Sequence, residues 1–255
     1  MREDYLDLYR ELYMRHWWWR AREKLILKTL RAQRPAQGWK SILDVGCGDG
    51  LFFDQLLQLG DVEGVEPSAA VVNPEGPHRS RIHICPFDES FQPGKQFSLI
   101  LMLDVLEHLS DPAASLGRAL ALLAPQGMLL VTVPAFKWLW TNHDVINEHF
   151  TRYTRKTFRE LAGRAGLQIR GERYFFQWLL LPKLATRIAE HLRGLPPQPT
   201  GVPPKGINTL FYLLSRLEQN TWGVLPWPFG TSLMVWGGRS PRECSADYSR
   251  PPDFG

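Results

Sequence analysis

The chain alternates short apolar runs with longer amphipathic segments. Residues 97–103, FSLILML, form an unbroken apolar run, which is typical of a parallel strand that is covered on both faces. Further strands are expected at residues 41–44, 61–66, 81–85 and 128–134, with helical patterns between most of them. This alternation predicts a doubly wound α/β sheet.

A glycine-rich loop follows the first predicted strand. Asp44 ends that strand within the segment SILDVGCGDG, and Gly46, Gly48 and Gly50 then occupy every second position. Glycines this dense let the backbone adopt unusual dihedral angles and lie against a flat or charged small molecule. The loop therefore predicts a nucleotide-like cofactor. A dinucleotide site would need a further glycine where this chain has Leu51, and no Gly-Lys-Ser/Thr phosphate loop follows.

The pattern Asp-x-Gly-x-Gly-x-Gly resembles motif I of the class I S-adenosylmethionine-dependent methyltransferases. The later string DVLEHL resembles the segment after strand four in small-molecule members of the quinone and lipid type. The resemblance implies a Rossmann-like, mostly parallel seven-stranded sheet and S-adenosyl-L-methionine as cofactor. It also implies that Gly46, Cys47 and Gly48 wrap the methionine part of the cofactor, whose positive charges Asp44 would face.

Three further acidic residues are candidates for the cofactor site. Glu66 ends the second predicted strand, where a carboxylate can accept hydrogen bonds from both ribose hydroxyls. Asp88 is the candidate partner of the adenine amine, although an aspartate in a turn often bonds its own backbone instead. Asp104 lies at the carboxyl end of the fourth strand, where open α/β sheets hold ligands. Residues 107–108, Glu-His, are expected to support this loop.

Residues 136–166 are dense in groups that can hold and move protons. His149 is the first candidate for a general base and His143 the second, because histidine titrates near neutrality and can take a proton from a hydroxyl. Tyr153 is a third candidate catalytic residue, and Arg152 is a candidate to bind an anionic substrate. The alternative is a network that only caps the following helix and holds the loop. Many bacterial methyltransferases of lipids or polysaccharides carry a similar string.

Residues 1–40 are predicted to form a helical lid ahead of the methyltransferase domain at 41–239. One long helical pattern is interrupted by a tryptophan triplet at 17–19. Successive residues on a helix point in different directions, so at least one tryptophan must contact something other than the core. The segment resembles leading helices that cover the cofactor or substrate mouth, with His16 and Arg20 as polar members. A plain helix docked by its tryptophans is the alternative.

A helical insertion is predicted at about 177–228, before the last strand. It contains two amphipathic stretches joined by the proline-rich segment LPPQPTGVPPKG. Neither stretch reaches the roughly 18 to 20 apolar residues that span a bilayer, yet both have the composition of interfacial helices. The insertion is therefore a candidate substrate lid, dimer contact or membrane-surface element. Residues 240–255, rich in proline, serine and charge, are predicted to form a disordered tail.

Composition and charge limit the kinds of partner and the cellular location that the chain is expected to have. The net charge of +4 is mild and the chain has no Lys/Arg stripes, so no nucleic-acid partner is expected. Cys47, Cys85 and Cys244 suit neither a disulfide framework nor a zinc site, and no metal is predicted. Residues 1–30 lack the pattern of a signal peptide. These features predict a cytoplasmic location. The amphipathic insertion adds peripheral attachment to the inner membrane face as a second prediction.

The predicted function is methyl transfer from S-adenosylmethionine to a small-molecule or lipid-linked acceptor, at oxygen. Two alternatives remain at this point. One is an NAD-type oxidoreductase, against which Leu51 argues. The other is a catalytically inactive relative that serves as a binding or scaffolding protein. The sequence indicates neither the acceptor nor the oligomeric state.

Overall fold

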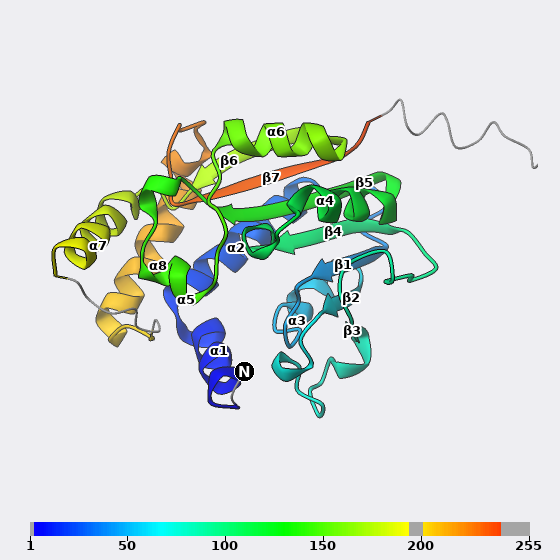
Figure 1. Ribbon diagram of the computed structural model, residues 1–255, viewed down its shortest axis with the longest axis horizontal. Helices are drawn as coiled ribbons and strands as arrows, with labels where there is room; N and C mark the ends of the chain where they lie inside the picture. Colours follow the sequence, from blue (N-terminus) through cyan, green and yellow to red (C-terminus); the bar gives the residue numbers. More distant parts are fainter. Residues whose placement is uncertain (1–2, 194–200, 241–255) are drawn as a thin grey trace, which may run out of the picture.

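The computed structural model describes residues 3–193 and 201–240 of the 255-residue chain. Its centre is a seven-stranded sheet with the order β3-β2-β1-β4-β5-β7-β6 (Figure 1). Strands β1 to β5 pair in parallel, whereas β7 runs antiparallel to both β5 and β6. The predicted Rossmann-like, mostly parallel seven-stranded sheet is confirmed. The strands are β1 (Ser41–Val45), β2 (Asp61–Glu66), β3 (Ile82–Ile84), β4 (Phe97–Leu103), β5 (Leu123–Pro134), β6 (Leu167–Phe175) and β7 (Ser232–Arg239).

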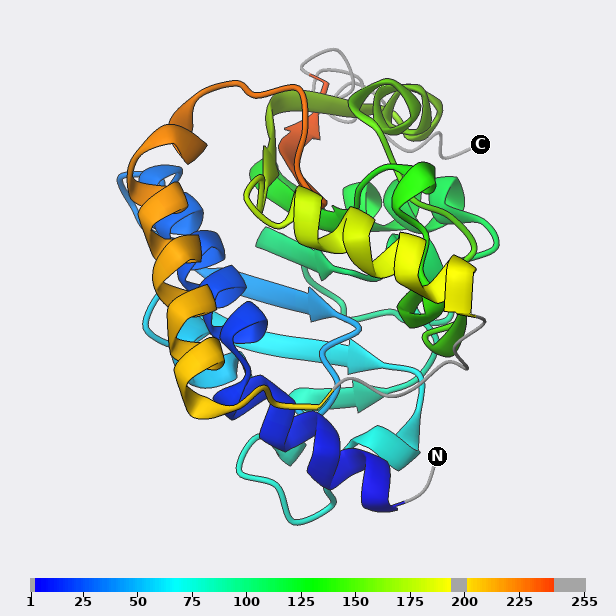
Figure 2. The same cartoon turned by 90° about the vertical axis from the view of Figure 1, so that its left-hand side faces the viewer.

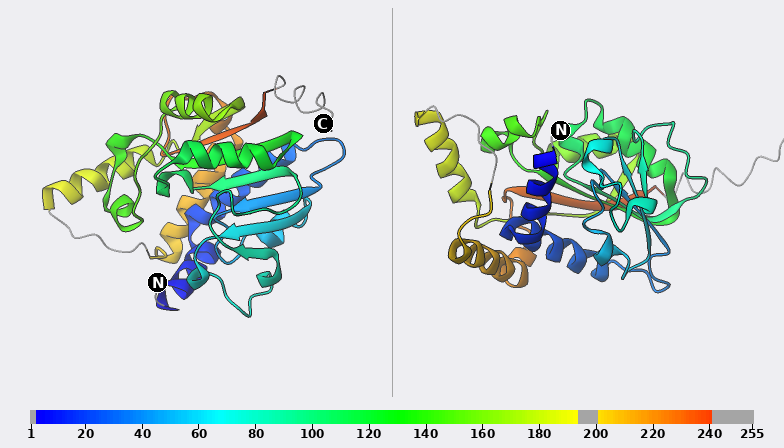
Figure 3. Two further views of the ribbon diagram at one scale, coloured as in Figure 1. Left: turned by 45° about the vertical axis from the view of Figure 1, so that its right-hand side comes forward. Right: turned by 90° about the horizontal axis from the view of Figure 1, so that it is seen from below.

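Helices cover both faces of the sheet (Figures 2 and 3). On one face, α4 and α6 bury residues such as Leu116 and Phe158 against the strands. On the other face, α2, α3 and α8 contribute Leu25, Phe53 and the partly buried Phe211. The helices are α1 (Glu3–Arg15), α2 (Trp17–Ala32), α3 (Phe53–Leu56), α4 (Pro112–Leu122), α5 (Asn142–Ile146), α6 (Arg155–Ala165), α7 (Leu180–Arg193) and α8 (Lys205–Asn220).

Helix boundaries follow the local sequence on the side of α4 and α6. Asp111 caps α4 by accepting a hydrogen bond from Ala114 N at 3.0 Å, and Pro112 occupies the first turn, where its missing N–H costs nothing. Gly166 ends α6 in the left-handed conformation, with φ at +79°. These boundaries agree with the sequence predictions.

The N-terminal helical pattern breaks at His16, directly before the tryptophan triplet that interrupts it in the sequence. The backbone of His16 is extended, and its Nδ1 accepts a hydrogen bond from Trp18 N at 3.1 Å, so it caps α2. Asn208 of α8 secures the junction by accepting from Trp17 N and donating to Arg15 O, both at 2.8 Å. The exact place of the break depends on a partner that lies 191 residues away in the sequence.

The segment between β6 and β7 forms α7 and α8, as the sequence predicted. Helix α8 lies along α2, and α7 crosses near the ends of the strands (Figure 2). The middle of the linker, residues 194–200, and the predicted tail from residue 241 onward lie outside the described residues. Within the described ranges, we find no helix with the length and apolar content needed to cross a membrane.

Candidate active site

A cavity of about 980 Å³ opens at the carboxyl ends of the parallel strands, the edge at which open α/β sheets bind ligands. Its walls come from α1, the start of α2, the glycine loop after β1, the turn after β4, the loop after β5, and α7 (Figure 1). Six predicted site residues line it: Asp44, Gly46, Cys47, Asp104, His143 and His149. Four others do not: Gly48, Glu66, Asp88 and Tyr153.

The turn after β1 takes its shape from its glycines. Gly46, Gly48 and Gly50 have φ values of +70°, +54° and +68°, in the region that favours glycine. A Cβ on Gly46 would lie 2.8 Å from a methyl group of Val105. The glycine loop and the turn after β4 therefore approach too closely for any side chain at Gly46, which leaves backbone at the cavity wall.

Cys47 has a packing role within the same loop. A Cβ added to Gly64 on β2 would collide with the Cys47 sulfur, so the thiol fills the space that Gly64 leaves. Burial, reinforced by the negative charge of Asp44, raises the pKa of the Cys47 thiol, which keeps it neutral. Cys47 thus lines the cavity as a small apolar group.

Asp44 is buried at the end of β1, with 4% of its surface exposed. Burial raises the pKa of Asp44 to about 7; Arg22 partly offsets this and Glu66 adds to it. A cationic group bound in the cavity would stabilise the carboxylate form. Asp44 is therefore placed to bind positive charge.

Glu66 stabilises the glycine loop through hydrogen bonds. At the end of β2 it accepts hydrogen bonds from Gly48 N and Ser68 N, both at 3.0 Å. Burial raises the pKa of Glu66, although these two hydrogen bonds favour the carboxylate. The predicted contact of Glu66 with ribose stays a prediction, which its position next to the loop allows.

Asp88 lies away from the cavity. Its carboxylate is exposed and accepts hydrogen bonds from the backbone N and the hydroxyl of Ser90, at 2.8 and 2.6 Å. The predicted contact of Asp88 with adenine is therefore not supported. The carboxylate stabilises its own turn, as aspartates in turns commonly do.

Helix α1 covers the glycine loop. The Tyr9 ring lies 3.8 Å from the position that a Cβ of Gly48 would occupy. Arg10 donates to Asp49 Oδ2 from Nε at 2.9 Å and from Nη2 at 2.6 Å. Asp49 in turn accepts from Asn73 N at 2.7 Å. One ion pair thus connects α1 to the loop between β1 and α3.

Arg22 of α2, which the sequence analysis overlooked, is a charged residue of the cavity wall. Its Nη2 lies 2.5 Å from Asp104 Oδ2 and 3.2 Å from Thr132 Oγ1. Asp104 has φ at +57°, a strained conformation of the kind that accumulates at functional sites. The predicted lid residue Arg20 instead packs on the Tyr212 ring at 4.4 Å, outside the cavity.

The three tryptophans divide between core and cavity, as helical geometry requires. Trp17 is buried against Phe176 and Phe211, with ring centroids 5.7 and 5.5 Å apart. All three line the cavity in part, and the Arg22 guanidinium lies 5.3 Å from the Trp18 ring and 5.6 Å from that of Trp19. Helix α2 is therefore docked by Trp17 and also contributes to the cavity wall, and the lid role of the N-terminal helices stays a prediction.

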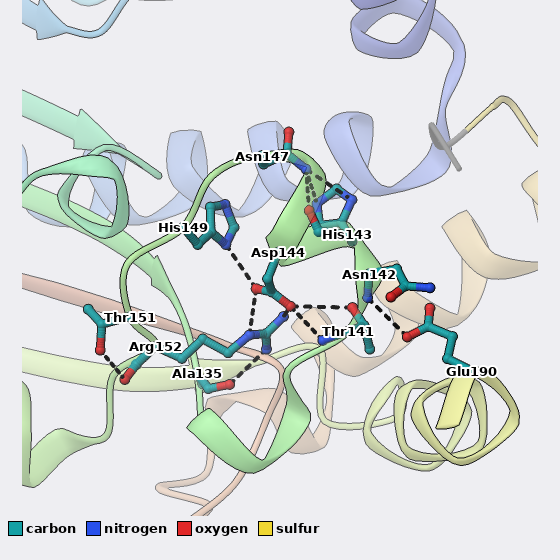
Figure 4. Close-up of polar contacts among 10 residues, drawn as sticks. All are labelled: Ala135, Thr141, Asn142, His143, Asp144, Asn147, His149, Thr151, Arg152 and Glu190. Atoms are coloured by element: carbon teal, nitrogen blue, oxygen red, sulfur yellow. Dashed lines mark hydrogen bonds and ion pairs between the residues drawn. The ribbon is translucent and has the colours of Figure 1, made fainter. Parts of the chain in front are cut away.

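A buried network holds the loop after β5 (Figure 4). The Asp144 carboxylate accepts hydrogen bonds from Arg152 Nε and Nη2, at 2.7 and 2.9 Å, and from Thr141 N at 2.8 Å. His149 Nδ1 lies 2.8 Å from Asp144 Oδ1. Burial opposes ionisation of Asp144, but the hydrogen bonds from His149 and Arg152 outweigh it and hold the pKa of the carboxyl below its usual range. His149 Nδ1 therefore donates to a carboxylate, which leaves Nε2 for a substrate or ligand.

Arg152 and Tyr153 have structural positions. Arg152 is 6% exposed and is occupied by Asp144 and by Ala135 O, so it orients Asp144 and is not available as an anion site. Tyr153 is buried outside the cavity, and its hydroxyl donates to Leu106 O at 3.3 Å. This placement does not favour the predicted catalytic role of Tyr153, which stays a prediction, because its hydroxyl is hydrogen-bonded outside the cavity.

His143 shares the cavity with His149, and their ring centroids are 6.2 Å apart. Burial, with a further contribution from the positive charge of Lys183, lowers the pKa of His143 to about 4. His143 is therefore neutral near pH 7. Its interactions include Asn147, which donates to the carbonyl oxygen of His143 at 2.7 Å.

Glu107 and His108 join His149 in one cluster. A ligand atom from each of these three side chains lies within 4.8 Å of the others, and the imidazole centroids of His108 and His149 are 4.7 Å apart. Glu107 is 1% exposed, and burial, together with the Asp104 charge, raises the pKa of its carboxyl well above the usual range. The sequence analysis expected the Glu-His pair only to support the loop, because His149 lies 41 residues further along the chain.

Comparison with known proteins identifies the family. A family model described as a methyltransferase domain matches residues 10–171, more than half of the chain. The chain belongs to this methyltransferase family. The matched region contains the glycine loop, Asp104 and the whole network around Asp144.

Similar sequences and structures agree. Ubiquinone biosynthesis O-methyltransferases from Bradyrhizobium sp. and Rhodopseudomonas palustris are 37% and 34% identical over 103 residues, 38% of this chain and 41% of theirs. The chain thus spans about two fifths of the length of these relatives. An S-adenosylmethionine-dependent methyltransferase from Thermotoga maritima has a TM-score of 0.56 at 15% identity, covering 93% of this chain and 97% of its own. This likeness shows the shared fold.

The methyltransferase uses S-adenosyl-L-methionine, and the residues present fit this cofactor. Buried Asp44 faces the cavity where the cofactor's positive charges need a partner, and the loop presents backbone rather than side chains at Gly46. A Haemonchus contortus N-methyltransferase that was crystallised with S-adenosylhomocysteine has a similar fold, with a TM-score of 0.54 at 17% identity and coverage of 86% of this chain and 52% of that one. The alternative of an NAD-type oxidoreductase is not supported.

Cofactor affinity should depend on pH through Asp44. Because burial raises the pKa of Asp44 to about 7, a cationic cofactor must displace a proton below that pH. We expect the affinity for S-adenosylhomocysteine to rise with pH by up to about tenfold per unit below 7 and to level off above it. Isothermal titration in buffers of different ionisation enthalpy would detect the released proton. An affinity that stays constant from about pH 5.5, 1.5 units below the pKa of Asp44, to about pH 8, 1 unit above it, would contradict this prediction.

Loss of the α1 ion pair should speed cofactor release. Arg10→Ala removes the connection to Asp49, a part-buried ion pair, and ion pairs near the surface contribute about 0.2 to 1 kcal/mol. We expect S-adenosylhomocysteine to dissociate about 1.5- to 5-fold faster in stopped-flow measurements, with little change in melting temperature. Arg15→Ala, which removes only the Glu11 pair within α1, is the matched control. Equal release rates for both variants would remove α1 from the cofactor lid.

Proposed function

We propose that this methyltransferase transfers a methyl group to an oxygen atom of a small-molecule or lipid-like acceptor. The observation that carries this proposal is the pairing of His149 with Asp144 at the cavity wall, 2.8 Å apart. A hydroxyl acceptor must lose a proton as it attacks, and an imidazole oriented by a carboxylate can receive it. Carbon and nitrogen acceptors do not depend on such a group to the same degree.

In this proposal the chain supplies alignment and proton transfer. The bound cofactor supplies the methyl group. Asp44 and the glycine loop hold the cofactor, while His149 Nε2 faces the acceptor hydroxyl and Asp144 keeps Nδ1 protonated. Trp18, Trp19 and the other apolar walls exclude water, which favours a reaction in which the positive charge of the sulfonium disappears.

Helix α7 favours an acceptor with a charged or polar head and an apolar tail. Lys183 and Glu190 face the cavity, whereas Leu181 and Leu192 on the same helix are 74% and 77% exposed. Burial lowers the pKa of Lys183 to about 8, so the side chain remains largely protonated at pH 7 and can bind an anionic head group. The names of the similar O-methyltransferases support an oxygen acceptor on a lipid-like molecule.

The proposal is tested by following a labelled methyl group. Purified enzyme and labelled cofactor are incubated with lipid and aqueous extracts, and the labelled product is identified by mass spectrometry. The proposal expects a methyl ether or methyl ester in the lipid fraction. Label on nitrogen or carbon would contradict the oxygen assignment, and bound cofactor without any product would indicate an inactive relative.

We further propose that the insertion docks on an anionic membrane surface. Residues 177–228 contain five basic and two acidic side chains, and α8 exposes a stripe of apolar residues on one side. Its members are Ile207, Leu210, Leu213 and Leu217, which are 47% to 57% exposed. Such a basic, amphipathic pair of helices is typical of an interfacial element.

Replacing exposed leucines of α7 should weaken membrane binding. For Leu181→Gln/Leu192→Gln we expect at least about tenfold weaker binding to phosphatidylglycerol-containing vesicles, because burying a leucine contributes about 1.5 to 3 kcal/mol. Leu57→Gln, an exposed leucine beside α3, is the control. Vesicle co-sedimentation measures the effect. If the double variant binds like the unaltered protein, α7 does not contact the membrane.

A further inference from the structure

We propose that Glu107, His108 and His149 bind a divalent transition-metal ion in the active-site cavity. The three side chains come from two separate segments, the turn after β4 and the loop after β5, and meet with their ligand atoms within 4.8 Å of one another. All three line the cavity. Two imidazoles and one carboxylate are a common ligand set for Zn²⁺, Fe²⁺ and similar ions. Three protein ligands leave further coordination positions of the ion open.

The Glu107 carboxylate gives independent evidence for a ligand. It is 1% exposed, and among the described residues its Oε2 atom has no hydrogen-bond partner. A buried carboxylate oxygen without a partner is costly. A bound cation would supply the missing partner, and no nearby side chain of the described structure does so.

The surroundings of His149 are those of a metal ligand. Its Nδ1 pairs with Asp144 at 2.8 Å, and Asp144 is itself fixed by Arg152 (Figure 4). Histidines that bind metals usually donate their second ring nitrogen to a carboxylate in this way, which fixes the tautomer and the ring orientation. Asp144 is therefore a positioning residue for Nε2.

The two segments are also joined through the backbone. Phe150 N donates to Glu107 O at 2.7 Å, and Glu148 has φ at +54° immediately before the ligand histidine. This strained turn brings His149 back toward Glu107. The fold thus holds the ligands together without needing the ion to assemble them.

Use of the ion in catalysis rests on the proposed oxygen acceptor. With the ion bound, His149 Nε2 is a ligand and no longer the base. The acceptor hydroxyl would bind at an open position of the ion, which lowers its pKa, and its proton would pass to water at the ion. An oxygen lone pair then forms the bond to the methyl carbon, while the carbon–sulfur bond breaks and its electron pair stays on sulfur. The neutral thioether and the methylated oxygen are the products. An acceptor with two neighbouring oxygen atoms would bind such an ion best.

Metal titration of the full-length, untagged protein after chelator treatment tests the site. We expect one Zn²⁺ per chain by isothermal titration, and Co²⁺ should give the visible absorption of a nitrogen- and oxygen-ligated ion. We expect His108→Ala and Glu107→Gln each to weaken Zn²⁺ binding at least tenfold. His108 is an exposed ligand that is not needed for packing. His83→Ala is the matched control, because His83 forms a surface pair with Glu63 at 3.1 Å.

The outcomes separate this proposal from the proposed function. Unchanged Zn²⁺ affinity in His108→Ala and Glu107→Gln would overturn the metal site. Full methyl transfer by a chelator-treated protein that binds no Zn²⁺ would also overturn the metal site. In that case the proposed oxygen acceptor would stand, with His149 as the base. Stoichiometric Zn²⁺ binding that both variants weaken supports the site, even if the methylated atom proves to be nitrogen or carbon.

Discussion

Replacing Asp44 by alanine should weaken S-adenosylhomocysteine binding by about 30- to several thousand-fold. Removing one partner of a buried, hydrogen-bonded charge pair costs about 2 to 5 kcal/mol. Asp44 is a buried carboxylate of the cavity wall, and we expect it to pair with the cofactor's ammonium. Isothermal titration at pH 8 measures the loss. Asp61→Ala, which removes an exposed carboxylate from β2, should leave the affinity unchanged.

Removing the charge of Asp44 with the isosteric Asp44→Asn substitution should not unfold the protein. The pKa of Asp44 is raised in the folded state to about 7, so its ionisation disfavours the fold as pH rises from the unfolded value toward 7. Asp44→Asn should therefore melt at the same or a higher temperature than the unaltered protein at pH 8, and the difference should shrink toward pH 4. A large loss of melting temperature at pH 8 would instead make Asp44 a structural residue.

The sequence predicted the sheet and the glycine loop because their signals are local. The glycine loop, the apolar run of β4 and the cap at Asp111 each lie within a few residues of the structure that they determine. The exact place of the break at His16 could not be predicted, because it depends on Asn208 of α8. Arg22 was missed for the same reason, since its partner Asp104 lies in the turn directly after β4.

The loop after β5 shows where residue type alone is insufficient. His149, Arg152 and Tyr153 all have suitable chemistry in the sequence, but only the structure shows which groups are free to act. Arg152 is occupied by Asp144, and the hydroxyl of Tyr153 by a carbonyl oxygen. His149 keeps one nitrogen for the cavity, and its approach to Glu107 depends on a non-local hydrogen bond. The spacing of His149 and Glu107 in the sequence does not indicate that they lie close together.

Replacing His149 by alanine should reduce kcat by about 10² to 10⁴, the usual contribution of a positioned acid or base. The affinity for S-adenosylhomocysteine should change little, because the cofactor residues Asp44 and Gly46 lie in a different part of the cavity wall. Both proposed uses of His149 Nε2, as a base and as a metal ligand, place it at the acceptor oxygen. The effect should therefore appear in single-turnover methyl transfer and not in cofactor binding.

Two neighbouring variants sharpen this test. His143→Ala should cost less than about tenfold in kcat, because a histidine whose pKa is lowered to about 4 is too weak a base near pH 7. Asp144→Asn should reproduce most of the His149 defect and shift the pH profile of the rate, because the amide no longer fixes the Nδ1 proton. If His149→Ala and His143→Ala lose activity equally, the catalytic group is not the one that Asp144 orients.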